Sequence, residues 1–187
     1  VERRAGAGSR GRRGEGGMSE GVSSEAPARP APEEQSWRVR PASGEDAPAV
    51  ARALDELLIE LGGKRPGLEE IEAEARALVD DPAAGALLVA EAEGEIVGVL
   101  AASWQRAPHV PGRYGTIQDL WVDPAWRSRK VGHGLVEALA ANAREQGIGR
   151  LEVGLPRESF AAIEATERFY AGNDFAHLGP RMRRLLE

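Results

Sequence analysis

The sequence predicts one α/β domain built on a mixed central β-sheet of about six to seven strands, with helices on both faces. Apolar residues recur with a helical period in some segments and alternate with a period of two in the segments between them. A hairpin signal in the first half predicts antiparallel pairing, and alternating strands and helices in the second half predict parallel pairing. The expected order is β-α-α-β-β-β-α-β-α-β.

The first strand and two helices are expected before residue 82. Residues 37–40 alternate between apolar and charged side chains, as a strand does. A helix is expected over 50–61, where apolar residues follow a helical period until Gly62-Gly63 ends the pattern. A second amphipathic helix is expected over 68–79, and Asp80-Asp81-Pro82 ends it.

The middle of the chain predicts a β-hairpin. The apolar segments 87–90 and 96–100 flank a turn at Glu93-Gly94. Gly98 inside the second segment indicates a bulge or a close backbone contact. The remaining elements follow in order: a loop over 108–112, a strand over 116–122, a helix over 131–143 that stops at Gly147, a strand over 151–155, a helix over 161–171 and a final strand over about 178–185.

The first 36 residues differ in composition from the rest. Residues 1–17 hold five arginines and two glutamates among glycines, and residues 18–36 have no apolar periodicity. Two interpretations are a tether to nucleic acid or membrane and a disordered leader, with Met18 as a natural start. The short length and the lack of aromatic side chains favour the leader. We therefore expect a disordered segment over 1–36 and one domain over 37–187.

Composition narrows the function classes. The formal net charge is -6, which argues against a general nucleic-acid binder. The chain has no cysteine, so disulfides and thiol nucleophiles are excluded, and a cytoplasmic protein is expected. No apolar run reaches the roughly 20 residues that a membrane helix needs. His109, His133 and His177 are too scattered for a sequence-local metal site, so no metal is expected.

The most informative stretch is residues 121–136. A strand ends at Asp123-Pro124, a short polar turn follows, and a helix opens near Val131. The first amides of a helix have no helical partner, and the helix dipole favours an anion beside them. Three basic side chains accompany them: Arg127, Arg129 and Lys130. The turn therefore predicts a phosphate site made of backbone N–H groups, with a solvated basic turn as the alternative.

The pattern Val-x-Pro-x-x-Arg-x-x-x-Val-Gly-x-x-Leu in this stretch resembles the acetyl-CoA pyrophosphate loop of the GNAT N-acetyltransferase superfamily. The resemblance covers about residues 37–185 and implies the GNAT fold. Residues 119–122 look like the family strand that pairs with the pantetheine arm. Arg168-Phe169-Tyr170, followed by Phe175, looks like the late helix whose tyrosine lies near the CoA sulfur. The implied acetyl-CoA-binding residues are Leu120, Trp121, Val122, Arg127, Ser128, Arg129, Lys130, Val131, Gly132, His133, Gly134 and Tyr170.

Three positions depart from the family pattern. Lys130 stands where the loop usually has glycine, and we expect it to take an ordinary helical conformation. Ile163 replaces an asparagine that contacts the cofactor. Gln118 replaces a glutamate, so a base at that position is lost.

The resemblance implies direct transfer of an acetyl group from acetyl-CoA to a primary amine. The strands ending at Val122 and Leu155 are expected to splay, and free amides near 120–122 would stabilise the oxyanion. Tyr170, with a reference pKa of about 10, is the candidate acid for the departing thiolate; a core aromatic is the alternative. The base that takes the proton of the amine is either Asp119 or a chain of water molecules. Alternatively, Asp119 is a structural hydrogen-bonding group at the end of the strand.

The acceptor amine is also left open. Acidic side chains on the first two helices would attract a cationic amine, or they form a solvated face. They are Asp55, Glu56, Glu60, Glu69, Glu70, Glu72 and Glu74. Arg106 and Arg113, in the loop before the next strand, favour a carboxylate on the acceptor instead.

Three function classes remain. The first is an acetyl-CoA-dependent N-acetyltransferase acting on a small molecule or a protein. The second is an acyl-CoA-binding sensor or interaction module without turnover, which the substitutions at Gln118, Lys130 and Ile163 keep open. The third is a nucleotide-binding regulator. The resemblance also allows a homodimer through the edge of the final strand.

Overall fold

A computed structural model of the chain describes residues 36–179. Their five strands form one sheet in the order β1-β2-β3-β4-β5. The bounds of the strands are β1 Arg38–Pro41, β2 Gly85–Ala92, β3 Glu95–Ala107, β4 Val110–Val122 and β5 Leu151–Val153. Strands β1 to β4 pair antiparallel, and β5 pairs parallel to β4. The mixed sheet confirms the expected fold class, but the described residues form five strands and not the expected six to seven.

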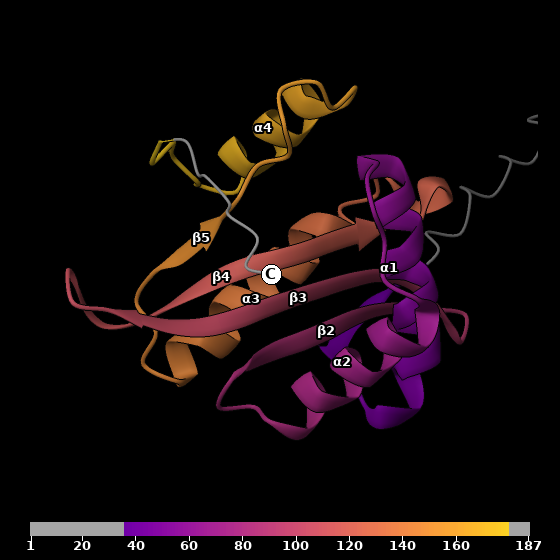
Figure 1. The fold of residues 1–187 in the computed structure, drawn as a ribbon, viewed down its shortest axis with the longest axis horizontal. Coiled ribbons are helices and arrows are strands. Elements are labelled where there is room, and N and C mark those ends of the chain that lie inside the picture. Colours follow the sequence, from indigo (N-terminus) through magenta and orange to yellow (C-terminus); the bar gives the residue numbers. More distant parts are fainter. Residues whose placement is uncertain (1–35, 180–187) are drawn as a thin grey trace, which may run out of the picture. The chain divides into compact units, whose positions relative to one another are not determined.

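Helices cover both faces of this sheet (Figure 1). The helices are α1 Ala47–Leu61, α2 Leu68–Asp80, α3 Val131–Glu145 and α4 Ile163–Ala171, with short 3-10 helices η1 Gly44–Asp46 and η2 Pro124–Trp126. Helices α1 and α2 share one hydrophobic core with Val99 and Trp121 of the sheet. Helix α3 shares the other core with Leu100 and Ile117, and Tyr170 of α4 belongs to this second core. None of these helices is long and apolar enough to span a bilayer.

The helix boundaries follow the local signals in the sequence. Helix α1 ends where Gly62 takes a φ of 70°, which is a left-handed conformation that glycine adopts without strain. Gly98 in β3 sits next to a register shift, and a Cβ there would lie 2.9 Å from Val131 of α3. Both expectations for Gly98, a bulge and a close contact, are therefore confirmed.

The segment before the site differs from the expectation. We expected a loop over 108–112 and a strand from 116, but β4 already begins at Val110 and pairs with Ala107 of β3. The turn shrinks to two residues because Val110 is buried and pairs in the sheet. Strand β5 ends at Val153 rather than at Leu155. Most of the expected final strand lies outside the described residues, as do the expected leader and the strand edge for a homodimer.

Candidate active site

The site is built where β4 and β5 separate. Their parallel pairing ends at Ile117 and Val153, whereas β4 continues to Val122. Figure 1 shows β5 turning away from β4 toward α4. A register shift in β4 makes Gln118 an extra residue between the pairs Ala102–Ile117 and Ala101–Asp119. A bulge of this kind bends its strand, so it helps to open the gap. The expected splay is confirmed, and residues 118–122 have no β5 partner within the described chain.

The turn after β4 presents a row of backbone amides without backbone partners. Asp123 closes the strand by accepting a hydrogen bond of 2.7 Å from the Ala125 N–H. In the described chain, the amides of residues 127, 128 and 130–133 make no backbone hydrogen bond, whereas the Gly134 amide donates to the Lys130 carbonyl at 2.9 Å. Such amides at the positive end of a 15-residue helix can bind an anion. This geometry agrees with the phosphate site that the turn predicts, which stays a prediction.

The conformation of Lys130 differs from the sequence expectation. Lys130 has φ 63° and ψ 10°, in the left-handed region, and Ser128 also has a positive φ of 64°. We expected an ordinary helical conformation for Lys130, and this was wrong. Left-handed residues within a turn direct consecutive N–H groups into one concavity, which is an anion-binding arrangement. The loop therefore keeps the backbone path that glycine would give, with a lysine side chain on it.

Trp37, from the segment before β1, contacts this loop and the first turn of α3. Its indole Nε1 donates a hydrogen bond of 3.1 Å to the Arg129 carbonyl. Its ring lies so close to Gly134 that a Cβ there would overlap it. On the other side of the helix start, a Cβ on Gly132 would lie 3.1 Å from the Phe169 ring. The two glycines are thus explained by packing: each lets an aromatic ring cover the first turn of α3.

The basic side chains of the loop have different surroundings. Arg127 donates to the Val122 carbonyl at 3.0 Å and pairs with Glu60 of α1 at 2.5 Å, so it joins the loop to α1. The Arg129 guanidinium lies 5.1 Å from the centre of the Trp126 ring, a cation–π distance. Lys130 is exposed. An incoming anion would therefore meet the Lys130 charge directly and the Arg127 charge only beside Glu60.

Tyr170 and Asp119 are the two expected catalytic side chains, and the structure brings them close enough to interact. Burial raises the pKa of Tyr170 to about 12, and the charge of Asp119 adds to this rise. Burial also raises the pKa of the Asp119 carboxyl above its ordinary value. The Tyr170 ring packs edge-on against Phe169 and Phe175, with centroids 5.1 and 5.4 Å away. The pair offers a protonated phenol and a carboxylate of raised basicity.

The sequence model of the Acetyltransferase (GNAT) family matches residues 50–170, a range that holds the loop, Asp119 and Tyr170. The chain belongs to this family. A comparison with curated proteins gave no match.

Solved structures agree with this GNAT assignment at the level of the fold. A possible acetyltransferase from Clostridium difficile 630 has a TM-score of 0.68 at 17% identity, covering 81% of this chain and 97% of its own. A ribosomal-protein-alanine N-acetyltransferase from Brucella melitensis biovar Abortus 2308 has a TM-score of 0.61 at 22% identity, covering 81% and 99%. A predicted acetyltransferase from Clostridium acetobutylicum, solved with acetyl-CoA, has a TM-score of 0.66 at 17% identity, covering 80% and 96%.

Three residues expected to bind acetyl-CoA have side chains that pack in the two hydrophobic cores. Trp121 is buried in the core under α1 and α2, and Leu120 and Val122 pack on the α3 side. At these three positions β4 has no pairing partner in β5. Within residues 36–179, no group of three histidine or acidic side chains could hold a metal ion.

Sequence reasoning missed two contacts that position the GNAT site. Trp37 was assigned to a strand without any contact to the loop. Asn173 Oδ1 accepts a hydrogen bond of 2.6 Å from the His133 Nδ1–H, and Asn173 Nδ2 donates to the Phe169 carbonyl at 2.7 Å. It therefore links the start of α3 with the end of α4. Neither contact had a signal in the sequence, because each joins residues at least 40 positions apart.

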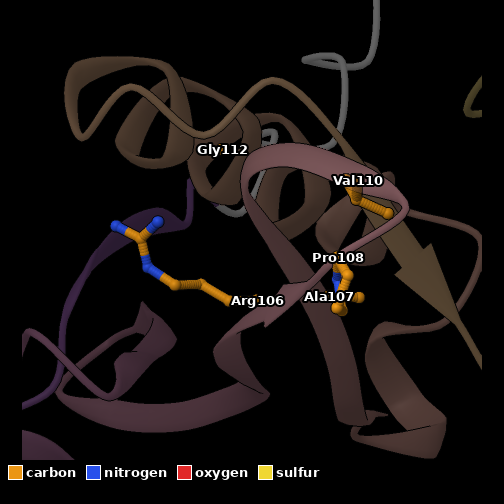
Figure 2. Close-up of a pocket in the computed structure, with 5 residues that line it drawn as sticks. All are labelled: Arg106, Ala107, Pro108, Val110 and Gly112. Carbon is orange, nitrogen blue, oxygen red and sulfur yellow. The ribbon is translucent and has the colours of Figure 1, made fainter.

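A pocket of about 360 Å³ lies elsewhere, at the tip of the β3–β4 hairpin (Figure 2). Its lining residues are Arg106, Ala107, Pro108, Val110 and Gly112. It shares none of them with the loop or with the Asp119–Tyr170 pair. Arg106 extends away from Pro108 and Val110 in this view. The pocket is therefore separate from the candidate GNAT site.

Proposed function

We propose that this protein transfers the acetyl group of acetyl-CoA to a primary amine by direct attack in a ternary complex. The observation that carries the proposal is that the amides of residues 127, 128 and 130–133 have no backbone partner in the described chain and lie at the start of α3, in a turn where Ser128 and Lys130 have positive φ. A diphosphate needs several donors at once, and backbone amides at a helix start supply them without any side-chain rearrangement. Membership of the GNAT family supports CoA as the owner of that diphosphate.

In this proposal, CoA runs from the loop along the free edge of residues 118–122. The acceptor nitrogen attacks the thioester carbonyl, the carbon–sulfur bond breaks, and amides near Leu120 stabilise the oxyanion. Asp119, with its pKa raised by burial, takes the proton of the amine directly or through water. Tyr170 is protonated at neutral pH and donates to the departing thiolate. We also propose a cytoplasmic location.

Binding and turnover test this proposal separately. Calorimetry with CoA should show association, and release of free CoA thiol should follow when acetyl-CoA meets a panel of amines, amino acids, amino-acid amides and aminosugars. CoA binding without thiol release from any acceptor would favour the acyl-CoA-binding module. ATP stabilising the fold as well as CoA does would favour the nucleotide-binding regulator. Absence of CoA binding would refute all use of the loop as a diphosphate site.

A further inference from the structure

Four uncharged side chains form a hydrogen-bonded network on β3 and β4. The Tyr114 hydroxyl donates to Gln105 Oε1 at 2.9 Å, and Gln105 Nε2 donates to Ser103 Oγ at 3.0 Å. Gln118, the bulge residue, donates from Nε2 to the same Ser103 oxygen at 2.8 Å. Gln118 is exposed and the other three are half-buried, so the network is open to a ligand.

This network lies on the same face of the sheet as Asp119. Val99 and Ala101 of β3 pack in the core under α1 and α2, and strand alternation places Ser103 on that face too. Trp121 of β4 packs in the same core, which puts Asp119 on this face, next to Gln118 in the chain. An amine must come within hydrogen-bond reach of its base. An acceptor whose amine reaches Asp119 therefore extends over this network.

Several charged groups around this face already have hydrogen-bond or ion-pair partners. Glu152 of β5 accepts from Arg150 at 2.5 Å, and Arg113 donates to the Ala83 carbonyl at 2.9 Å. Three acidic side chains of α1 and α2 also have basic partners: Asp55 with Arg65, Glu60 with Arg127 and Glu72 with Arg76. These pairs weaken both charge-based expectations for the acceptor, the cationic amine and the carboxylate.

The network leaves one donor and one acceptor free. Ser103 Oγ accepts two hydrogen bonds, so its own O–H is available to donate, and no donor within residues 36–179 reaches Gln118 Oε1. A carboxamide complements this pair, because its carbonyl accepts from Ser103 and its N–H donates to Gln118. A carboxylate would put an oxygen against Gln118 Oε1, and an ammonium would face the Ser103 O–H.

We infer that the acceptor carries a neutral carboxamide beside its amine, held by Ser103 and Gln118, an inference that rests on the proposed function. The test uses the full chain with acetyl-CoA and three acceptors: alaninamide, alanine methyl ester and alanine. The amide and the ester share a carbonyl and have amines of similar basicity, and only the amide has the N–H for Gln118. A neutral hydrogen bond contributes about 1 kcal/mol, so kcat/KM for the amide should exceed that for the ester by about threefold to tenfold.

Two variants give different signatures. Gln118→Ala should bring the amide-to-ester ratio close to one, whereas Ser103→Ala should lower kcat/KM for both, because both carbonyls lose their donor. Gln146→Ala is the matched control, since Gln146 bonds Asn142 at the end of α3, and it should keep the wild-type ratio. Circular dichroism and thermal midpoints of the variants confirm folding.

The outcomes separate the inference from the function it rests on. Equal rates for amide and ester, a preference for alanine or a diamine, or an unchanged ratio in Gln118→Ala would overturn the carboxamide inference while leaving acetyl transfer intact. Turnover of other amines with none of the three alanine compounds would overturn it as well. If no amine releases CoA thiol, the proposed function fails and the inference fails with it.

Discussion

Polar groups at two places in the molecule differ in their hydrogen bonding. At the edge formed by β1 and β2 they are paired with one another, whereas several at the junction of β4 with α3 have no backbone partner in the described chain. At the β1–β2 edge, Arg40 makes two hydrogen bonds to the Asp46 carboxylate, at 2.7 and 2.9 Å, and a third to Glu91 at 2.8 Å. At the β4–α3 junction, the amides of residues 127, 128 and 130–133 have no backbone partner in the described chain, and the half-buried Asp119 lies close enough to Tyr170 to raise its pKa. The charged groups of the first region satisfy one another's hydrogen bonds. The backbone amides of the second region are the donors that the proposed diphosphate would use.

The comparison predicts where changes act. Substitutions at the β1–β2 edge should alter stability and leave catalysis unchanged. Substitutions at the β4–α3 junction should alter binding or rate. Some of them should also stabilise the protein, because groups that serve binding or catalysis often lower the stability of the folded state.

The largest expected effect is that of Tyr170→Phe, which removes the proposed acid and keeps the ring between Phe169 and Phe175. General acid catalysis contributes about 100-fold to 10,000-fold, and a thiolate is a good leaving group, so we expect kcat to fall about 100-fold. The KM for acetyl-CoA should stay within about twofold, because the loop is untouched. Steady-state thiol release measures both constants. The matched control is Tyr114→Phe, which removes a hydroxyl from β4 and should keep most of the kcat for a simple alkylamine. An unchanged kcat in Tyr170→Phe would exclude this tyrosine as the acid.

Replacing either of two aspartates by asparagine should change the free energy of unfolding, with opposite signs for Asp46 and Asp119. Arg40 lowers the pKa of Asp46 in the folded protein, so its stabilisation is present above the ordinary pKa of 3.8 and is lost as pH falls through the lowered value. Burial raises the pKa of Asp119, so the stability linked to its protonated form is present below 3.8 and is lost as pH rises through the raised value.

At about pH 7, Asp46→Asn should therefore lower the free energy of unfolding by about 2 kcal/mol, and Asp119→Asn should raise it while lowering kcat/KM. Near pH 3 the difference for Asp119→Asn should vanish, because the wild-type carboxyl is then largely protonated in the folded and the unfolded state. The difference for Asp46→Asn should shrink only in part, because the carboxyl of the folded protein is still ionised at that pH. Urea unfolding at the two pH values measures them. A loss of stability in Asp119→Asn at neutral pH would mean that the carboxylate is satisfied, contrary to the comparison.

The sequence predicted the parts of the molecule that depend on local pattern. Helix α3, its free amides and the splay beyond Ile117 follow from apolar periodicity, from Asp123-Pro124 and from strand order. The left-handed Lys130 could not be predicted, because a lysine has no intrinsic preference for that region and only the loop around it imposes it. The Trp37 and Asn173 contacts are tertiary, and neither residue belongs to a local motif.

The contact between Trp37 and the loop predicts an intermediate effect. In Gly134→Ala the new Cβ would overlap the Trp37 ring, which must then move and lose its hydrogen bond to the Arg129 carbonyl. We expect CoA affinity to fall about tenfold by calorimetry, since a hydrogen bond and its packing contribute about 1 to 2 kcal/mol. Gly149→Ala is the matched control, because nothing lies within 4 Å of a Cβ there. Trp37→Phe, which keeps a ring but no N–H donor, should fall between the two. Wild-type affinity in Gly134→Ala would show that the ring does not position the loop.

The smallest effect sharpens the comparison at a single residue, Lys130. A left-handed conformation costs a non-glycine residue about 1 kcal/mol, so Lys130→Gly should raise the free energy of unfolding by about that amount, whereas Lys130→Ala should not. This order reverses the usual rule that alanine is more stable than glycine near a helix. Both variants lose the same charge, so both should bind CoA more weakly at low salt and approach the wild type at high salt. Lys64→Ala, on the exposed α1–α2 connection, is the matched control for loss of a lysine. Urea unfolding measures the effect of backbone strain on stability, and calorimetry at two salt concentrations measures the effect of the charge on CoA binding. An alanine variant as stable as the glycine variant would mean that the loop does not hold residue 130 in its left-handed state.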